Sequence, residues 1–136
     1  MEGVGSVLVI DDEPGLQDVL GTLLRGAGFE VNSAMSAKEG VLQIRDEEID
    51  VVLLDLMLPD RSGLEILPEI KTFDPHLPVV VITAYSSVES AIEAMRRGAF
   101  HYVPKPFTNE EVLHLVRRAA ERRALLVENL QLRSQL

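Results

Sequence analysis

The chain has 136 residues, 46% of them hydrophobic and only 4% aromatic, so one domain with a core of Val, Leu, Ile and Ala is expected. Its 22 acidic and 13 basic residues give a net charge of −9, which argues against direct contact with nucleic acid, because phosphate binding needs clustered Lys and Arg. The lack of Cys excludes disulfides and thiolate metal sites, and without a signal peptide or an apolar run near the roughly 20 residues of a membrane helix, we predict a soluble cytoplasmic protein with no membrane partner.

Five short strands are predicted along the chain, each followed by a helical segment. The strand runs are VLVI, FEVNSA, VVLL, VVVI and FHYV, at residues 7–10, 29–34, 51–54, 79–82 and 100–103. Continuous apolar character suits strands covered on both faces, as in parallel sheets, whereas FEVNSA is more polar and belongs nearer an edge.

The helical segments carry recognisable start and stop residues. Pro14 suits the first turn of the first helix, and Gly28 suits its end. Ser36, with Glu39 three residues later, predicts a capping box for a second helix that reaches about residue 46. Three further helices are predicted: one at about 63–73 with Pro68 inside it, one that is capped by Ser86 or Ser87 and closed by Gly98, and one from residue 108 onward.

The alternation of strands and helices predicts an α/β fold with a doubly wound parallel sheet, in which ligands bind at the carboxyl ends of the strands. Polar residues follow four of the five predicted strands. Asp11 and Asp12 follow the first, Asp55 the third, Thr83 the fourth and Lys105 the fifth. If the strands are parallel, these five side chains lie on one edge of the sheet.

Three carboxylates at one edge repel one another unless a cation joins them. Mg²⁺ prefers oxygen ligands, and the charge of Mg²⁺ plus Lys105 balances the charge of the three Asp side chains. Such a site suits phosphoryl transfer to a carboxylate nucleophile. The hydroxyl of Thr83 and the backbone N–H groups of Met57 and Ala84 are the candidate donors to phosphoryl oxygens.

Five motifs stand at the strand ends in a fixed order: Asp11-Asp12, Asp55, Thr83-Ala84, Tyr102 and Lys105-Pro106. This set resembles the receiver domain of two-component response regulators. Each motif is weak alone, but five matches in order and spacing are a specific signal. The resemblance covers about residues 6–121 and implies a flavodoxin-like five-stranded sheet in the order 2-1-3-4-5. We therefore expect a disordered N-terminus at residues 1–5, a receiver domain at 6–121 and a linker helix at 122–136.

The resemblance also implies the role of each site residue. Asp55 is the expected phosphoacceptor, with a histidine kinase as donor, and Mg²⁺ is the expected cofactor. Its ligands would be Asp11, Asp12, Asp55 and the backbone carbonyl of Met57. The phosphoryl group would contact Thr83, Ala84 and Lys105, the switch pair would be Thr83 with Tyr102, and the bond before Pro106 would be cis. Such a domain is a switch and not an enzyme with turnover.

Two loop positions tune the lifetime of the phosphorylated state in this family. Here they are occupied by Met57 and Tyr85, neither of which is an acid or an amide that orients an attacking water. We therefore expect slow self-dephosphorylation.

Each site residue also has an ordinary structural explanation. Asp11 and Asp12 can cap the helix that follows them, and Asp55 can form a turn. Thr83 can be an N-cap, Tyr102 a half-buried strand residue and Lys105 a solvated surface residue. Only their convergence at one edge favours the functional interpretation.

The last helical segment is longer than the domain needs. It runs from residue 108 to 136 without Gly or Pro, about 29 residues, or some 43 Å at roughly 1.5 Å per residue. Its heptad-like residues, at 4-3-4 spacing, are Leu125, Asn129, Leu132 and Leu136. We predict pairing between two chains through them, although a second stripe, Leu126 with Leu130, leaves the register open. The alternative is that these leucines dock on the domain itself.

A receiver followed by a helix that ends in ENLQLRSQL is similar to the amino-terminal part of the nitrogen-regulator C class of sigma-54-dependent activators. The resemblance implies a fused ATPase module and a DNA-binding module, so transcription would be controlled through receiver dimerisation. No GxxxxGK[ST] loop occurs in this sequence, and we expect it to be a fragment of a longer protein.

Three rival functions remain. A single-domain phosphorelay receiver would not need the heptad tail. A haloacid-dehalogenase-type phosphatase also uses an Asp nucleophile, Mg²⁺ and Lys, but its nucleophile lies in a DxD pattern after the first strand, where this chain has DDE. A flavodoxin-like binding module would want a Gly/Ser/Thr-rich loop where DDEPG stands.

Overall fold

The structure is a computed structural model that describes residues 5–134. Strands and helices alternate along this part of the chain, as predicted. In chain order they are β1 (Ser6–Ile10), α1 (Pro14–Gly26), β2 (Glu30–Ala34), α2 (Ala37–Asp46), β3 (Val51–Leu54), α3 (Gly63–Phe73), β4 (Val79–Thr83), α4 (Val88–Arg96), β5 (His101–Pro104) and α5 (Asn109–Ser134). The disorder predicted at residues 1–5 lies outside the described residues except for Gly5, and so does the heptad residue Leu136.

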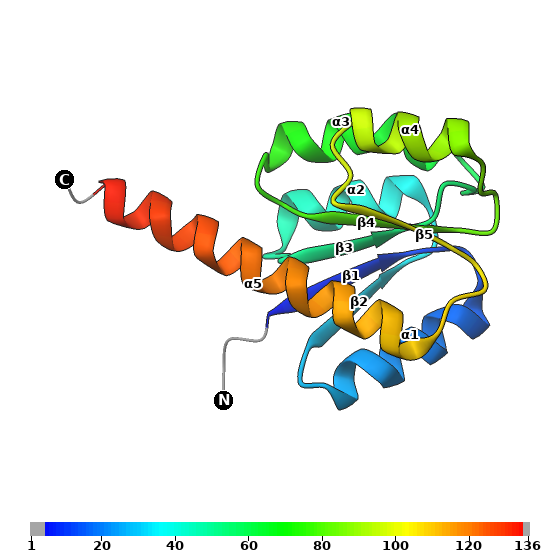
Figure 1. Ribbon diagram of the computed structural model, residues 1–136, viewed down its shortest axis with the longest axis horizontal. Helices are drawn as coiled ribbons and strands as arrows, with labels where there is room; N and C mark the ends of the chain where they lie inside the picture. The colour runs from blue at the N-terminus through cyan, green and yellow to red at the C-terminus, as the bar shows by residue number, and fades with distance from the viewer. Residues whose placement is uncertain (1–4, 135–136) are drawn as a thin grey trace.

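The strands form one parallel sheet in the order β2-β1-β3-β4-β5, which confirms the predicted order. Helices α2, α3 and α4 cover one face of this sheet, and α1 and α5 cover the other (Figure 1). The more polar strand β2 lies at an edge, as expected. Because all five strands point the same way, the residues that follow them gather at a single edge of the sheet.

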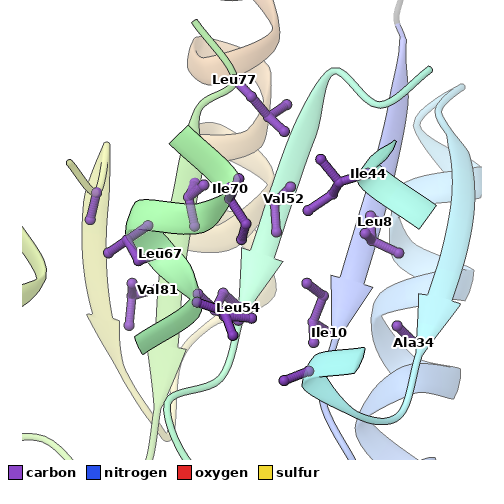
Figure 2. Packing of buried hydrophobic residues seen from close by; sticks show 14 of the residues in the cluster. Leu8, Ile10, Ala34, Ile44, Val52, Leu54, Leu67, Ile70, Leu77 and Val81 are labelled. Carbon is purple, nitrogen blue, oxygen red and sulfur yellow. The ribbon is translucent and has the colours of Figure 1, made fainter. Parts of the chain in front are cut away.

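The core consists of two aliphatic layers, one on each face of the sheet. Successive side chains of a strand point to opposite faces, so Leu8 and Ile10 join the layer under α2, α3 and α4, while Val7 and Val9 join the layer under α1 and α5. Figure 2 shows the first layer, in which strand residues meet Ile44, Leu67 and Ile70 from the helices. Burial on both faces explains why the strand sequences are continuously apolar. Each fully buried aliphatic side chain contributes about 1.5–3 kcal/mol, which makes the sheet a rigid support for the loops at its end.

Two helix caps follow the sequence prediction, one of them only in part. The hydroxyl of Ser36 accepts from the backbone N–H of Glu39 at 3.2 Å, which begins α2. The return bond of the expected capping box is displaced, because the Glu39 carboxylate accepts from the N–H of Met35, at 3.0 Å, and not from that of Ser36. Of the two candidates for α4, Ser87 is the cap, and it forms a complete capping box with Ser90.

Gly28 is the expected end of the first helix, and Pro68 is expected inside the third. α1 ends at Gly26, and Gly28 adopts a φ of 99° in the turn that follows. Pro68 lies inside α3 without ending it. A proline cannot donate to the carbonyl four residues earlier, that of Leu64, and this carbonyl accepts instead from the guanidinium of Arg97 at 2.7 Å. The hydrogen bond missing from α3 is thus replaced by a contact with the end of α4.

Helix α5 begins on the sheet and extends past the edge at which the strands begin (Figure 1). Its buried residues are Val112, Leu115, Val116 and Ala119. Arg123 still contacts the domain, because its guanidinium donates to the Asp74 carboxylate at 2.9 and 2.6 Å. Beyond it, Leu125 and Leu132 are 64% and 53% exposed, so these two leucines do not dock on the domain. Within residues 5–134, none of the helices is both long enough and apolar enough to span a bilayer.

Candidate functional site

The sheet register places two of the acidic residues side by side. Ile10 pairs with Leu54, so the residues that follow them, Asp11 and Asp55, leave adjacent strands at the same level. The N–H of Asp55 donates to the Ile10 carbonyl at 3.0 Å, and the N–H of Asp11 donates to the Ala34 carbonyl at 3.0 Å. The backbones of both residues are therefore fixed by hydrogen bonds to the neighbouring strands, and both residues are buried, with 3% and 6% of their surface exposed.

Three carboxylates converge at this edge, as the sequence predicts. Asp11, Asp12 and Asp55 each offer one oxygen, and these oxygens all lie within 4.8 Å of one another. Asp12 is exposed to solvent, while the other two are buried. Oxygen donors in this number and spacing fit a hard divalent cation such as Mg²⁺, which commonly keeps waters beside its carboxylate ligands. The residues present thus fit the metal that the receiver resemblance implies.

Lys105 reaches the same point from the end of β5. Its Nζ lies 3.0 Å from Oδ2 of Asp11, 3.2 Å from Oδ2 of Asp55 and 3.2 Å from Oε1 of Glu13. Glu13 is a contact that sequence reasoning missed, and its only signal was its place in the DDE run. The peptide bond between Lys105 and Pro106 is cis, the isomer that the resemblance implies.

The pKa shifts follow from this crowding. Burial raises the pKa of Asp11, and the nearby charge of Asp55 acts in the same direction, although the N–H of Glu13 and the ammonium of Lys105 oppose them. Burial alone would lower the pKa of Lys105, but the hydrogen bonds and charges of Asp11 and Asp55 outweigh it and raise that pKa. Lys105 therefore stays charged at neutral pH, yet one ammonium cannot balance the acids around it.

The loop after β3 closes over the site. The N–H of Met57 donates to Oδ1 of Asp55 at 3.1 Å, which leaves Oδ2 facing Lys105. A backbone bridge between Met57 and Ser62 closes the base of the loop, and the hydroxyl of Ser62 caps α3. A hollow of about 410 Å³ opens here, lined by Asp12, Glu13, Asp55, Met57, Leu58, Pro59, Ala84 and Lys105. Of the two expected backbone donors, Met57 now binds Asp55, and Ala84 lines the same hollow.

Thr83 and Tyr102 lie on neighbouring strands and both contact the loop between β4 and α4. The hydroxyl of Thr83, fully buried, accepts from the N–H of Tyr85 at 3.0 Å. The hydroxyl of Tyr102 donates to the carbonyl of Tyr85 at 3.3 Å and lies 2.7 Å from the hydroxyl of Ser90 in α4. Sequence reasoning missed Ser90, which gives no signal beyond its place near a helix start. Tyr85 thus connects the two residues of the expected switch pair.

The heptad residues do not join this site. Leu125, Asn129 and Leu132 are exposed on the C-terminal part of α5. This part of the helix extends past the opposite edge of the sheet (Figure 1). Leu126 of the competing stripe is only half exposed, and it lines a groove together with Phe100 and Arg122. The acidic site and the exposed part of α5 are therefore separated by the length of the strands.

Comparison with known proteins identifies relatives across most of the chain. Residues 7–117 match the family model described as "Response regulator receiver domain". The chain is 35% identical over 128 residues to the regulatory protein AtoC of Escherichia coli (strain K12). This match covers 94% of this chain and 28% of AtoC. It is 33% identical over 133 residues to the C4-dicarboxylate transport transcriptional regulatory protein DctD of Rhizobium meliloti, covering 98% of this chain and 29% of DctD. The chain thus spans less than a third of the length of these two regulators.

Solved structures agree with the sequence matches. A response regulator receiver domain protein from Clostridium thermocellum superimposes with a TM-score of 0.84 at 38% identity, covering 90% of this chain and 98% of that one. NtrX from Brucella abortus gives a TM-score of 0.86 at 34% identity, covering 97% of this chain but only 31% of NtrX.

Proposed function

Because this chain belongs to the response regulator receiver domain family, we propose that it is a cytoplasmic phosphorylation switch in which Asp55 accepts a phosphoryl group from a histidine kinase. Mg²⁺ would be held by Asp11, Asp12 and Asp55 together with the backbone carbonyl of Met57. The observation that carries this proposal is the position of Lys105, whose ammonium bridges Asp11 and Asp55 at 3.0 and 3.2 Å beside the triad of carboxylates. The rival phosphatase finds no support, since the family is that of receivers.

The residues of the site divide the chemistry among them. The oxygen of Asp55 that Met57 does not bind attacks phosphorus, a P–O bond forms, and the P–N bond of the phosphohistidine breaks with its electron pair left on the imidazole. A bound divalent cation neutralises charge on the transferring group. Lys105 exchanges its hydrogen bond to Asp55 for one to a phosphoryl oxygen, and it is charged throughout. Thr83 and the N–H of Ala84 line the remaining side as donors.

Labelling of the purified protein tests this assignment. With Mg²⁺ and a small phosphodonor such as acetyl phosphate, the wild type should take up one phosphoryl group that base and hydroxylamine release, as expected of an acyl phosphate. Asp55→Asn should abolish the labelling, whereas Asp46→Asn, at an exposed acid paired with Arg45, should not change it. Full labelling of the Asp55 variant would refute the assignment.

The switch is proposed to act through the contacts of Tyr85. When the hydroxyl of Thr83 turns to a phosphoryl oxygen, it loses the hydrogen bond that it accepts from the N–H of Tyr85. The loop between β4 and α4, whose Tyr85 carbonyl also accepts from Tyr102, then has one hydrogen bond fewer to the sheet. The surface made by α4, β5 and α5 then repacks, which is a local charge event that biases a two-state element. Thr83→Ala should therefore keep phosphoryl uptake but lose the change that follows it, measured as amide shifts in α4.

The phosphorylated state is proposed to be long-lived, because Met57 and Tyr85 are neither acids nor amides. Both side chains are exposed, at 58% and 63%, and Met57 lines the hollow beside Asp55. Loss of label within seconds from the isolated phosphorylated protein would contradict this expectation.

The output is proposed to be a fused sigma-54-dependent ATPase with a DNA-binding module, controlled by dimerisation of the receiver. Support comes from the similarity to AtoC and DctD, which are much longer than this chain, and from the exposed leucines of α5. The corresponding division is a receiver at residues 6–121 and a linker helix at 122–136, in which Leu125, Asn129, Leu132 and Leu136 pair between chains.

The mass of the protein in solution, with and without beryllofluoride as a phosphoryl mimic, tests dimerisation. Leu125→Glu with Leu132→Glu should leave a monomer in both conditions, whereas Arg118→Glu, at an exposed position of α5 on the domain, should leave the mass unchanged. A monomeric wild type in both conditions would refute the pairing without affecting the phosphoacceptor.

A further inference from the structure

Gln17 of α1 is a buried polar residue that the site described above does not use. Only 8% of its surface is exposed. Its side-chain Nε2 lies 3.0 Å from the carbonyl oxygen of Val9, 2.9 Å from that of Asp11 and 3.1 Å from that of Ala34. These three carbonyls stand where β1 and β2 end, so one helix side chain binds the carboxyl ends of two strands.

Only an amide or a similar donor suits this position. The Nε2 group carries two hydrogens, which are shared among the three carbonyl oxygens. The opposite orientation would place Oε1 against three other oxygens, so the direction of the amide is fixed by its surroundings. An apolar side chain here would remove a donor from all three carbonyls, and a buried carbonyl left without any donor pays the full desolvation penalty. The carbonyl of Ala34 would keep the N–H of Asp11.

The contact with the Asp11 carbonyl bears directly on the acidic site. That carbonyl belongs to the planar peptide unit whose N–H is that of Asp12, so holding its oxygen sets the plane from which Asp12 leaves. The other groups of Asp11 are also fixed: its N–H by Ala34, Oδ1 by the N–H of Glu13, and Oδ2 by Lys105. Among these hydrogen bonds, the one from Gln17 is made to the carbonyl of the peptide that joins Asp11 to Asp12.

We propose that Gln17 is a positioning residue for the divalent-cation site, because it fixes the Asp11–Asp12 peptide so that the two carboxylates converge with Asp55. This inference rests on the proposed function, in which those carboxylates hold Mg²⁺. The partners of Gln17 are backbone carbonyls and not the carboxylates that would hold the cation, so it acts through the carbonyl of Asp11.

Gln17→Met tests the proposal, since methionine keeps the length and apolar stem of the side chain and removes both hydrogens. The dissociation constant of Mg²⁺, measured by NMR amide shifts on the whole chain, should rise about 10-fold or more, as is typical when the groups that orient metal ligands are removed. In the metal-free protein, hydrogen exchange at the N–H of Glu13, which Asp11 binds, should also become faster.

Leu20→Ala is the matched control. It lies on the same helix, 1% exposed, and its truncation opens a cavity in the apolar layer under α1 without touching any of the three carbonyls. This variant should lose stability but keep its Mg²⁺ affinity within about 2-fold of the wild type. Hydrogen exchange at the N–H of Glu13 should change no more than that of amides that exchange only through global unfolding.

The outcomes separate the two levels of the argument. A wild type that does not bind Mg²⁺ overturns the proposed function. A wild type that binds, with Gln17→Met binding equally well or Leu20→Ala losing as much affinity as Gln17→Met, overturns only the role of Gln17. If Gln17→Met does not fold, Gln17→Asn replaces it, because the shorter amide retracts the donor from the Asp11 carbonyl. Unchanged Mg²⁺ affinity in that variant would overturn the role in the same way.

Discussion

Replacing Asp55 by Asn should stabilise the metal-free domain, although it removes a partner of Lys105. The change keeps the shape of the side chain but leaves one acceptor oxygen where the carboxylate has two, and those two accept from the N–H of Met57 and from Lys105. It removes one negative charge from the three carboxylates whose oxygens lie within 4.8 Å of one another. Lys105 retains Asp11 and Glu13 as ionic partners.

Whether Asp55→Asn stabilises the domain depends on how the repulsion that it removes compares with the attraction that it loses. Unit charges 4.8 Å apart repel by about 3.5 kcal/mol at an effective dielectric constant near 20, so Asp55 carries about that much repulsion from buried Asp11 and a smaller, solvent-screened share from exposed Asp12. On the same scale, its attraction to Lys105 across 3.2 Å is about 5 kcal/mol. With the Asn oxygen turned to Lys105, that hydrogen bond keeps about 1.5–3 kcal/mol of the attraction, while the bond from the N–H of Met57, worth about 1 kcal/mol, is lost. The neutral side chain also no longer carries the penalty of burying an ion, so we expect a net gain of about 1 kcal/mol.

Urea unfolding at pH 7 in EDTA measures this gain, with Asp46→Asn, at an exposed carboxylate, as the control that should stay within about 0.5 kcal/mol of the wild type. Because the charge of Asp55 is one cause of the raised pKa of Asp11, that pKa should fall in the variant. Adding Mg²⁺ should stabilise the wild type more than the variant, since the cation relieves the same repulsion. An Asp55→Asn domain that is less stable than the wild type in EDTA by more than 1 kcal/mol would refute the electrostatic reasoning.

Three further predictions concern stability. Arg123→Met should lower the free energy of unfolding by about 2 kcal/mol, between the values for buried and exposed pairs, because the side chains of Arg123 and Asp74 are 16% and 29% exposed. The carboxylate of Asp60 accepts from the first two N–H groups of α2, and these hydrogen bonds lower its pKa in the folded protein. The stabilisation from Asp60 is therefore complete above the unfolded pKa of 3.8 and is lost as the pH falls through the lower folded pKa. Asp60→Asn should therefore flatten the acid side of the curve of stability against pH. Gly63→Ala should destabilise by about 3 kcal/mol, because the added Cβ would lie 2.5 Å from the backbone carbonyl at the end of β3.

Substitutions of the same residue types at positions without these contacts serve as controls. Arg118→Met, on an exposed face of the same helix as Arg123, should change urea unfolding by less than about 0.5 kcal/mol. Gly15→Ala, where a Cβ meets nothing within 4 Å, should stabilise by about 0.5–1 kcal/mol, in contrast to Gly63→Ala. Equal stability of Arg123→Met and the wild type, an unchanged acid limb in Asp60→Asn, or a neutral Gly63→Ala would each contradict the corresponding argument.

Local patterns in the sequence predicted the elements because the forces behind them are short-ranged. Continuous apolar runs indicated strands buried on both faces, and the runs VLVI, VVLL and VVVI lie in the buried strands β1, β3 and β4. The caps at Ser36 and Ser87 follow from hydrogen bonds between residues three positions apart. The same reasoning missed Arg97 as the partner of the carbonyl freed by Pro68, because the two residues belong to different helices.

The sequence by itself determined that acidic and basic side chains follow parallel strands, and therefore which residues share one edge of the sheet. Only the tertiary structure decided their contacts: Lys105 on Asp11, 94 residues apart in the chain, Gln17 on the carbonyls of two strands, and Arg123 on Asp74 at the opposite edge. The reason is physical. Periodicity and capping depend on neighbours along the chain, whereas charge pairing and buried hydrogen bonding depend on distances of a few ångströms that exist only after the strands have assembled in the order 2-1-3-4-5.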